Sequence, residues 1–366
     1  MSSRPATVTS DDVETWRDRE AVIDAEGMRG HIAGLPDQLA AGANSASSFV
    51  KVLDVPASGP TAIAVAGMGG SAIGGDLVAA YTDKRRVLPL HVIRGYELPA
   101  WLDQSTALIV SSYSGNTDET LACYEAAQKR GLSVIAITTG GRVAQMAREA
   151  GDPLLDLPTG FPPRAALGHS LSAVALVAAR LDPGLDAEAE ADGLRRAAER
   201  LRPLAERWLE WSDDNPALDV AASIADRLPV VYGGHATSIS AAARWKAQLN
   251  ENGKMPAYSG QLPEHNHNEI VGFEGDNPVL RQMVLVHLET PWDHHQVRRR
   301  FDFVHGYCRD RVARQHRIRA TSDVPLEGML ELCYLGDCTS LMASIINGWN
   351  PTPVASIDAL KNELKG

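Results

Sequence analysis

The segment T-A-I-A-V-A-G-M-G-G-S-A-I-G, Thr61–Gly74, decides the fold class of this chain. The short apolar run T-A-I-A-V-A-G at residues 61–67 predicts a buried strand, and the glycines at its end predict a tight turn. Glycine permits a positive φ and a close approach of the backbone to a ligand. The helix expected next would present free N–H groups at its first turn. This order of elements is typical of an anion-binding α/β unit.

The same rhythm recurs along the chain. Short apolar runs predict strands at residues 88–93, 106–112, 133–139, 228–234 and 283–288, with helices at 119–130, 182–207, 239–250, 327–347 and 357–364. Strands that alternate with helices indicate a parallel sheet covered on both faces. Because a strand, a glycine turn and a helix begin both halves, we predict an α/β fold of two doubly wound parallel-sheet domains, related by internal duplication.

The length of 366 residues suits two domains of about 150 residues each. We expect a helical N-terminal segment at residues 1–44, begun near Asp11 and Asp12, a first domain at 45–190 and a second at 200–366. Ligands in such sheets bind beyond the carboxyl ends of the strands. We therefore expect an active site between the two domains.

Composition excludes several classes of function. The net charge of −11 argues against non-specific nucleic-acid binding, which needs a basic face. No apolar run of about 20 residues predicts a membrane span, and the N-terminus lacks the apolar core of a signal peptide. The four cysteines show no C-x-x-C spacing, so neither a disulfide framework nor a zinc site is expected. We predict a cytoplasmic protein in which Cys123 packs in the core.

A second glycine-containing loop, S-S-Y-S-G-N-T at Ser111–Thr117, follows the predicted strand at 106–112. Hydroxyls on Ser112, Ser114 and Thr117, with the N–H groups of the next helix, can coordinate phosphate oxygens without a metal. A helix N-cap explains one hydroxyl but hardly three. The turn at Gly67–Ser71 is neither a clean dinucleotide fingerprint nor a Walker loop, and alone it could be a glycine turn without a ligand.

A polar run far downstream carries groups that move protons. It reads Q-L-N-E-N-G-K at Gln248–Lys254 and continues as L-P-E-H-N-H-N-E-I at Leu262–Ile270. Taken alone, Glu251 could be an exposed helix carboxylate, although asparagines on both sides of it favour a shaped site. His265 and His267 could bind a metal with the nearby glutamates. The spacing lacks the i, i+4 pattern of H-E-x-x-H, so no metal is predicted.

The two glycine loops resemble those of the sugar isomerase (SIS) domain, which binds phosphosugars. Four further motifs resemble the bifunctional phosphoglucose/phosphomannose isomerase family of bacteria and archaea: F-P-P-R-A-A-L-G-H-S at Phe161–Ser170, N-E-N-G-K at Asn250–Lys254, L-P-E-H-N-H-N-E-I-V-G at Leu262–Gly272 and I-D-A-L-K at Ile357–Lys361. The resemblance covers nearly the whole chain from about residue 45, whereas the first 40 or so residues match no motif.

The resemblance implies roles for particular residues. The substrate phosphate would be bound by Gly69, Gly70, Ser71, Ser112, Ser114 and Thr117. Arg164 would stabilise an enediolate, and Glu251 would be the base that moves a proton between C1 and C2. His267 would assist ring opening, and Lys361 would contact the sugar near its ring oxygen. No cofactor or metal is implied, because proton transfer through a cis-enediolate needs only a base and a fixed cation.

Three questions stay open at this stage. Glucose and mannose 6-phosphates differ only at C2, and the resemblance sets that contact at Thr352, or at Val354 if the register slips by two residues. The chain could instead isomerise another sugar phosphate, or be a non-catalytic phosphosugar sensor. The family also implies a homodimer in which His267 completes the partner's site. Pro256, Gly260 and Pro263 favour an excursion of this segment from the domain body.

Overall fold

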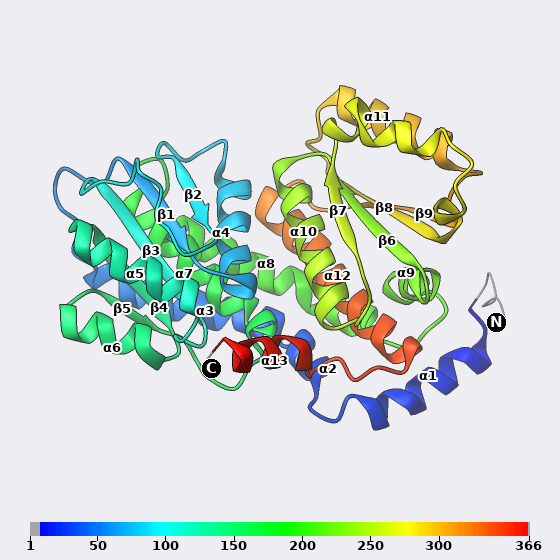
Figure 1. Cartoon of the computed structure of the whole chain (residues 1–366), viewed down its shortest axis with the longest axis horizontal. Coiled ribbons are helices and arrows are strands. Elements are labelled where there is room, and N and C mark those ends of the chain that lie inside the picture. Colours follow the sequence, from blue (N-terminus) through cyan, green and yellow to red (C-terminus); the bar gives the residue numbers. More distant parts are fainter. Residues whose placement is uncertain (1–7, 365–366) are drawn as a thin grey trace. The chain divides into compact units, whose positions relative to one another are not determined.

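The computed structural model describes residues 8–364 of the chain, and they form two compact units (Figure 1). The first unit comprises residues 34–202 and 324–329; the second comprises the described residues up to 33, residues 203–323 and those from 330 onward. These divisions differ from the predicted ones. Helix α3, Leu35–Val52, runs through the expected boundary at 44, and α8, Ala187–Trp208, runs through the expected linker at 190–200.

The first unit is built on a five-stranded sheet whose paired strands all run parallel, in the order β2-β1-β3-β4-β5. Its strands are β1 Ala62–Ala66, β2 Leu90–Ile93, β3 Thr106–Ser112, β4 Ser133–Thr138 and β5 Leu154–Asp156. The central strands β1 and β3 are buried along their whole length, as continuous apolar runs require.

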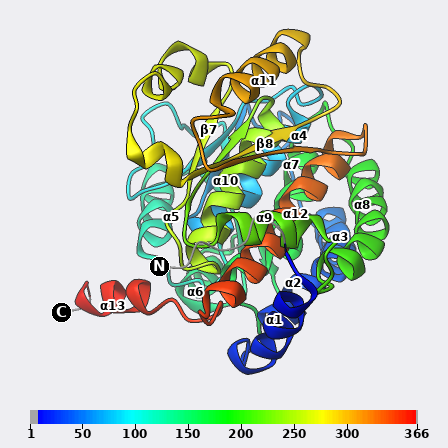
Figure 2. The ribbon, with the colours of Figure 1, turned by 90° about the vertical axis from the view of Figure 1, so that its right-hand side faces the viewer.

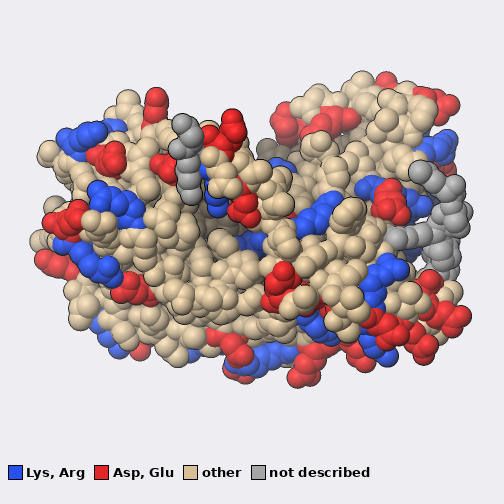
Figure 3. All heavy atoms as spheres, turned by 60° about the horizontal axis from the view of Figure 1, so that its bottom comes forward, with Lys and Arg blue, Asp and Glu red and all other residues tan. Residues whose placement is uncertain are grey.

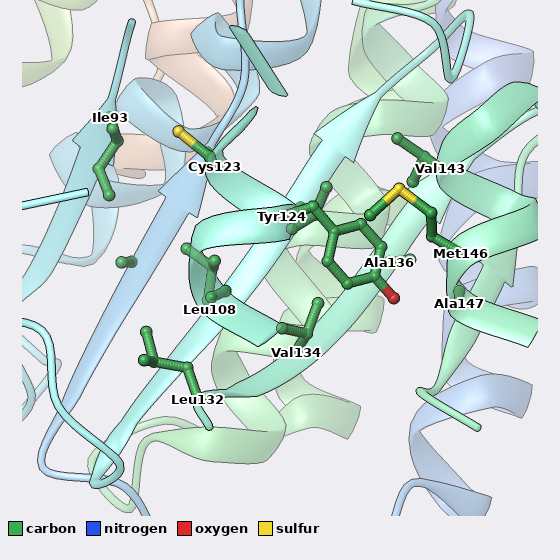
Figure 4. Packing of buried hydrophobic residues seen from close by; sticks show 14 of the residues in the cluster. Ile93, Leu108, Cys123, Tyr124, Leu132, Val134, Ala136, Val143, Met146 and Ala147 are labelled. Atoms are coloured by element: carbon green, nitrogen blue, oxygen red, sulfur yellow. The ribbon is translucent and has the colours of Figure 1, made fainter. Parts of the chain in front are cut away.

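Helices flank this sheet, as the alternating pattern predicts. They are α3, α4 Gly69–Thr82, α5 Asp118–Arg130, α6 Gly141–Ala150, α7 Leu167–Leu181 and the first part of α8. On one face, apolar side chains of β3, β4, α5 and α6 form a core around Tyr124, which is fully buried (Figure 4). Its hydroxyl donates to Asp152 Oδ2 at 2.6 Å. Cys123 packs in the same core, as predicted, and burial raises the pKa of its thiol.

The second unit repeats the plan with a four-stranded parallel sheet in the order β7-β6-β8-β9. Its strands are β6 Leu228–Gly233, β7 Tyr258–Gln261, β8 Met283–Glu289 and β9 Arg314–Arg319. In each unit the first strand in sequence lies between the second and the third, with the fourth outside the third. This shared strand order agrees with the predicted duplication.

The remaining helices belong mainly to the second unit, and Figure 2 shows several of them from the side. They are α1 Ser10–Ile23, α2 Met28–Ala33, α9 Pro216–Ile224, α10 Ala236–Glu251, α11 His295–Cys308, α12 Pro325–Asn347 and α13 Ala355–Glu363. Helix α1 begins in the predicted place. Thr9 is its N-cap, and Asp12 completes a capping box by accepting from the Thr9 backbone N–H at 3.1 Å.

Helix α12 corrects the expectation that no stretch of the chain could span a membrane. Among the described residues it alone is long and apolar enough to do so. Its most apolar window is entirely buried within the fold, which is the environment of a core helix. The face drawn in Figure 3 carries interspersed acidic and basic side chains among its described residues, without a broad basic patch of the kind that nucleic acids require.

Neutral histidines are buried beside the carboxyl half of the second sheet. His287 on β8 is fully buried between Tyr232 of β6 and Phe301 of α11, with ring centroids 6.1 and 5.5 Å away. Neither of its ring nitrogens has a hydrogen-bond partner among the described residues. Burial, and to a lesser extent His305 and other nearby cations, lowers the pKa of His287 to about 3.

This burial predicts acid sensitivity. Because the pKa of His287 is lowered on folding, its contribution to stability is present above about pH 6.5 and is lost progressively as the pH falls towards 3. Between pH 6.5 and 5 the loss is about 2 kcal/mol, at about 1.4 kcal/mol per pH unit. The unfolding free energy of the wild type should fall when the pH is lowered from 7 to 5. In His287→Leu, measured by denaturant unfolding at both pH values, this fall should be smaller by about 2 kcal/mol. The exposed His295→Leu should keep the wild-type slope, and an unchanged slope in His287→Leu would contradict the assignment.

Candidate functional site

Two loops meet at the carboxyl edge of the first sheet. One follows β1 at Gly67–Ser71 and the other follows β3 at Ser112–Thr117, and the two strands are hydrogen-bonded neighbours. The strand order reverses between them, because β2 lies on the far side of β1 and β4 on the far side of β3. A crevice opens at such a point, where ligands bind in open α/β sheets.

The first loop leaves no room for a side chain at Gly70. A Cβ there would lie 2.7 Å from the carbonyl oxygen of Pro163, so the loop is in direct contact with the segment that carries Arg164. Ser71 is buried, and its Oγ accepts a hydrogen bond of 3.0 Å from the backbone N–H of Tyr113. The Ser71 hydroxyl therefore links the first loop to the second.

The second loop gathers two of its three predicted hydroxyls. Ser112 Oγ donates to Thr117 Oγ1 at 3.2 Å and accepts from the backbone N–H of Gly115 at 3.2 Å. Gly115 has a φ of +67°, and a Cβ on it would lie only 1.8 Å from the carbonyl oxygen of Gly140. Only glycine fits there. Ser114 is exposed, and its Oγ accepts from the backbone N–H of Asn116 at 3.3 Å.

The helices that follow both loops begin with backbone amides available to a ligand. Helix α4 has Met68 at its N-cap and α5 has Thr117, and in neither case does the N-cap side chain accept from the first turn in the described structure. Helix N-termini attract anions through these N–H groups and through the helix dipole. Hydroxyls and amides at one edge form a site suited to a phosphate.

Arg164 brings a buried cation to the same edge. It lies in the short 3₁₀ turn Pro163–Ala165 and is only 5% exposed. Gln38 of α3 brackets this turn, since its side-chain amide donates to Ala165 O at 2.8 Å and its Oε1 accepts from Gly168 N at 3.2 Å. Gln38 could not be recognised from the sequence, because a single buried glutamine in a helix has no motif.

Tyr113 fixes the segment that precedes Arg164. Its hydroxyl donates to the carbonyl of Pro158 at 2.9 Å and accepts from the N–H of Phe161 at 3.1 Å. Tyr113 thus connects the hydroxyl loop to the arginine turn, just as Gly70 does from the other loop. The three segments of the first unit are held together as one site.

The equivalent edge of the second sheet is closed by its own side chains. His235 caps α10 through Nδ1, which accepts from Thr237 N at 3.3 Å, and the Trp292 indole also donates to that nitrogen at 3.0 Å. A helix end capped in this way has fewer free amides for an anion. Of the two sheet edges, the one in the first unit is therefore the better suited to an anion.

Glu251 is the last residue of α10 and is half-buried. The helix that carries it, α10, lies beside α12 (Figures 1 and 2), and polar residues anchor the two helices to each other. Arg244 pairs with Asp337 at 2.6 Å, both almost fully buried, and just beyond Glu251 the Asn252 amide donates to Ser340 Oγ at 3.0 Å. A buried pair of this kind fixes the helix because breaking it leaves an uncompensated charge.

The asparagines beside Glu251 have structural roles. Asn252 is fully buried against α12, and Asn250 Oδ1 accepts from the backbone N–H of Ala257 at 2.9 Å, just before β7. These bonds explain why residues of poor helix propensity stand there, since each ties the end of the helix to a neighbouring element. They hold the backbone on both sides of the carboxylate.

His265 and His267 lie in different environments. His265 is fully buried, with its ring 4.8 Å from that of Tyr232, and burial lowers its pKa. His267 is exposed at the end of the 3₁₀ turn Glu264–His267. The pair does not present two ligands to one point, and among residues 8–364 no group of three His, Cys, Asp or Glu side chains has the geometry of a metal site.

The structure corrects the predicted excursion between Glu251 and His267. The intervening residues form β7, which pairs in parallel with β6 at the edge of the sheet. Helix α10 starts at the carboxyl end of β6 and runs back, so Glu251 lies near the amino end of β7 and His267 follows the carboxyl end. A six-residue strand such as β6 spans about 20 Å, so we expect the two residues towards opposite ends of the strands.

Two other predicted residues lie near the C-terminus. Thr352 is half-buried and lies close to Glu251, because Lys254 donates to the carbonyl of Glu251 at 2.5 Å and to that of Pro351 at 3.2 Å. Val354 is the N-cap of α13 and is also half-buried. Lys361 is exposed on α13, a helix none of whose described residues is buried.

Comparison with known proteins agrees with this architecture. Residues 213–364 match the model of the bacterial phospho-glucose isomerase C-terminal SIS domain. A bifunctional phosphoglucose/phosphomannose isomerase from Caldicellulosiruptor bescii is 38% identical over 304 residues, 82% of this chain and 89% of that relative. One from Aquifex aeolicus is 34% identical over 83% of this chain and 90% of its own length.

A solved structure of a hypothetical protein from Thermus thermophilus has the same fold. Its TM-score is 0.71 at 16% sequence identity, over 96% of this chain and 93% of that one. With the two parallel sheets and the family match of the second unit, the predicted fold class, two SIS domains, is confirmed.

The close contact at Gly70 predicts that a side chain there will destabilise the fold. Gly70→Ala should lower the unfolding free energy by about 1–3 kcal/mol, because the new methyl group would push the first loop away from Pro163. Gly74→Ala, on the same helix, is the matched control, since its Cβ would meet Leu171 N at an ordinary 3.5 Å. Denaturant unfolding compares the two variants. Equal stability would contradict the prediction, because it would show that the loop accommodates the methyl group without cost.

Proposed function

We propose that this chain, which belongs to the bifunctional phosphoglucose/phosphomannose isomerase family, interconverts hexose 6-phosphates. Membership of this family makes the chain an isomerase. The proposed reactions are those of glucose 6-phosphate and mannose 6-phosphate with fructose 6-phosphate. The single observation that carries the proposal from the side of the structure is the convergence of hydroxyls, helix amides and Arg164 at one edge of the first sheet.

The first unit supplies groups suited to a phosphomonoester. Hydroxyls of Ser71, Ser112 and Thr117 and the amides at the starts of α4 and α5 are neutral donors, which suit a dianion that must be released after each turnover. Arg164 suits a different task. A planar, permanently charged guanidinium stabilises the negative charge that develops on O1 and O2 of an enediolate.

Proton transfer is assigned to Glu251. An aldose becomes a ketose when the C2 proton is removed and a proton is returned to C1, and one carboxylate can do both on a cis-enediolate. The anchored end of α10 supports this role, because a base must keep its position while the proton moves. His267 and Lys361 are assigned to opening the sugar ring, which takes a proton from the O1 hydroxyl and delivers one to O5.

Acceptance of both C2 epimers requires a polar group with some room near C2. Thr352 is the proposed residue, and its position beside the end of α10 favours it. Val354 offers no hydrogen bond, so a chain that used it would discriminate only by shape. A phosphosugar isomerase with another substrate, or a sensor without turnover, is the competing function. An assay that starts from fructose 6-phosphate and follows glucose and mannose 6-phosphates separately decides between them.

We further propose a homodimer in which His267 of each chain serves the partner's site. Support comes from the fold of the second unit, in which Glu251 ends helix α10 whereas His267 lies in the turn that follows the carboxyl end of β7. An exposed histidine beyond an edge strand is available to a second copy, and two-fold contacts between identical chains are the commonest assembly.

Replacing the base tests the chemistry. Glu251→Gln keeps the size and removes the basicity, so kcat for fructose 6-phosphate should fall by about 10²–10⁴ while substrate binding persists. Glu274→Gln, which removes an exposed carboxylate of the same unit, should behave as wild type. Turnover by Glu251→Gln within a few-fold of wild type would mean that another group is the base.

Mixing inactive variants tests the shared site. Glu251→Gln and His267→Ala homodimers should each be nearly inactive, whereas after subunit exchange a mixed dimer contains one site with both wild-type residues. About a quarter of wild-type activity is expected, because half of the dimers are mixed and half of their sites are complete. Demonstrated exchange without recovery would mean that both residues serve the same chain's site.

A further inference from the structure

Lys254 adopts a backbone conformation that a lysine adopts only at a cost. Its φ is +51°, and among residues 8–364 the only other non-glycine residue with a positive φ is Asp226. The left-handed region is unfavourable for residues with a Cβ, and glycine or asparagine usually occupies it at the end of a helix. A strained residue that persists in such a place is a reason to examine its side chain.

The glycine next to it is needed for a different purpose. Gly253 is buried, and a Cβ there would lie 2.6 Å from the carbonyl oxygen of Leu249. The reversal of the chain after α10 therefore falls on Lys254. Asn252 is the C-cap of the helix, and its N–H bonds to Gln248 O at 2.7 Å. The chain returns through Met255, whose N–H bonds to Leu249 O at 3.3 Å.

The Lys254 side chain binds three backbone carbonyls. Its Nζ donates to Glu251 O at 2.5 Å, to Pro351 O at 3.2 Å and to Pro353 O. Glu251 O is one of the terminal carbonyls of α10, which have no partner within the helix and carry the negative end of its dipole. A lysine ammonium has three protons to donate, so it can serve all three carbonyls at once.

The proline carbonyls flank Thr352. Prolines cannot donate a backbone N–H, so the segment Pro351–Pro353 cannot hold itself in place with a regular ladder of hydrogen bonds. Two of the contacts that hold it come from Lys254 and from Asn350, whose Oδ1 accepts from Thr352 N at 2.9 Å. Lys254 therefore connects the end of the helix that carries Glu251 directly to the turn that carries Thr352.

We propose that Lys254 is a positioning residue that sets the distance between the catalytic carboxylate of Glu251 and the C2-facing side chain of Thr352. The ammonium donates to three backbone carbonyls, so its proposed effect on the reaction is exerted through the segments that they belong to. It fixes the base and the epimer-discriminating group as one rigid assembly, so both the rate and the ratio of the two aldose products depend on it. This inference rests on the proposed function and adds to it the residue that couples catalysis to epimer selection.

Two substitutions separate the side chain from the strained backbone. Lys254→Met keeps the length of the side chain and removes the donors. Lys254→Gly removes the side chain and relieves the left-handed strain, so this variant is expected to fold even if the methionine variant does not. Lys246→Met, at an exposed position on the same helix, is the control for loss of a lysine charge.

With fructose 6-phosphate as substrate, both Lys254 variants should lose about tenfold or more in kcat, because a small displacement of a catalytic group has effects of this size. KM should change little, since the phosphate-binding groups belong to the first unit. The ratio of the initial rates at which glucose 6-phosphate and mannose 6-phosphate form should shift by about threefold or more. Thr352→Val should shift the ratio as well, and adding Lys254→Gly to it should shift the ratio no further.

The outcomes distinguish this inference from the proposed function. A wild-type protein that does not turn over fructose 6-phosphate would overturn the function itself, whereas retained activity in Glu251→Gln would overturn only the assignment of the base. If Glu251→Gln is inactive but both Lys254 variants keep the wild-type kcat and product ratio, only the role of Lys254 is overturned. A loss of kcat with an unchanged product ratio in a folded variant also overturns it, because a purely structural lysine would give that result.

Discussion

The constraint on which the rest of the structure depends is the parallel pairing of strands in both sheets. Parallel strands bring their carboxyl ends to one edge, and for this reason two loops separated by about 40 residues of sequence meet at Ser71 and Tyr113. The same constraint separates residues that are close in sequence. Helix α10 must return along β6 before β7 can pair, so Glu251 and His267 lie at opposite edges of the second sheet although only sixteen positions separate them.

Much of the fold could be predicted because its central strands are continuous apolar runs that end in glycines. Strand β3 was predicted with its observed bounds, and β1, β6 and β8 differ by a residue or two. Strands β7 and β9 were missed because they read Y-S-G-Q and R-Q-H-R-I-R. Side chains at a sheet edge need not be apolar, and such strands exist only because a neighbour offers its hydrogen-bonding edge. Helix α12 was predicted, but the complete burial of its most apolar window depends on tertiary packing that no local pattern contains.

The candidate site divides in a similar way. Hydroxyl loops were recognisable because several donors fall within a few residues after a buried strand. Gln38, Tyr113 and Lys254 were not recognised as parts of the site, since each acts through bonds to backbone atoms of a distant segment. Such bonds depend on where the partner segment lies. Because every residue type has a backbone carbonyl, the sequence of the partner segment carries no signal for them. The two histidines could not be told apart from the sequence. His265 is buried and His267 is exposed, and it is the packing of His265 against Tyr232 that distinguishes them.

The central claim is that a carboxylate moves a proton between C1 and C2 of a hexose 6-phosphate through an enediolate. Conversion of glucose 6-phosphate labelled with deuterium at C2, followed by NMR of the fructose 6-phosphate formed, tests it most directly. The account predicts that part of the label appears at C1 and the rest is lost to solvent, because a proton held on a carboxylate exchanges with water before it returns. Complete retention of the label at C1 in water, with no deuterium uptake when unlabelled substrate reacts in D₂O, would show a hydride shift and contradict the claim.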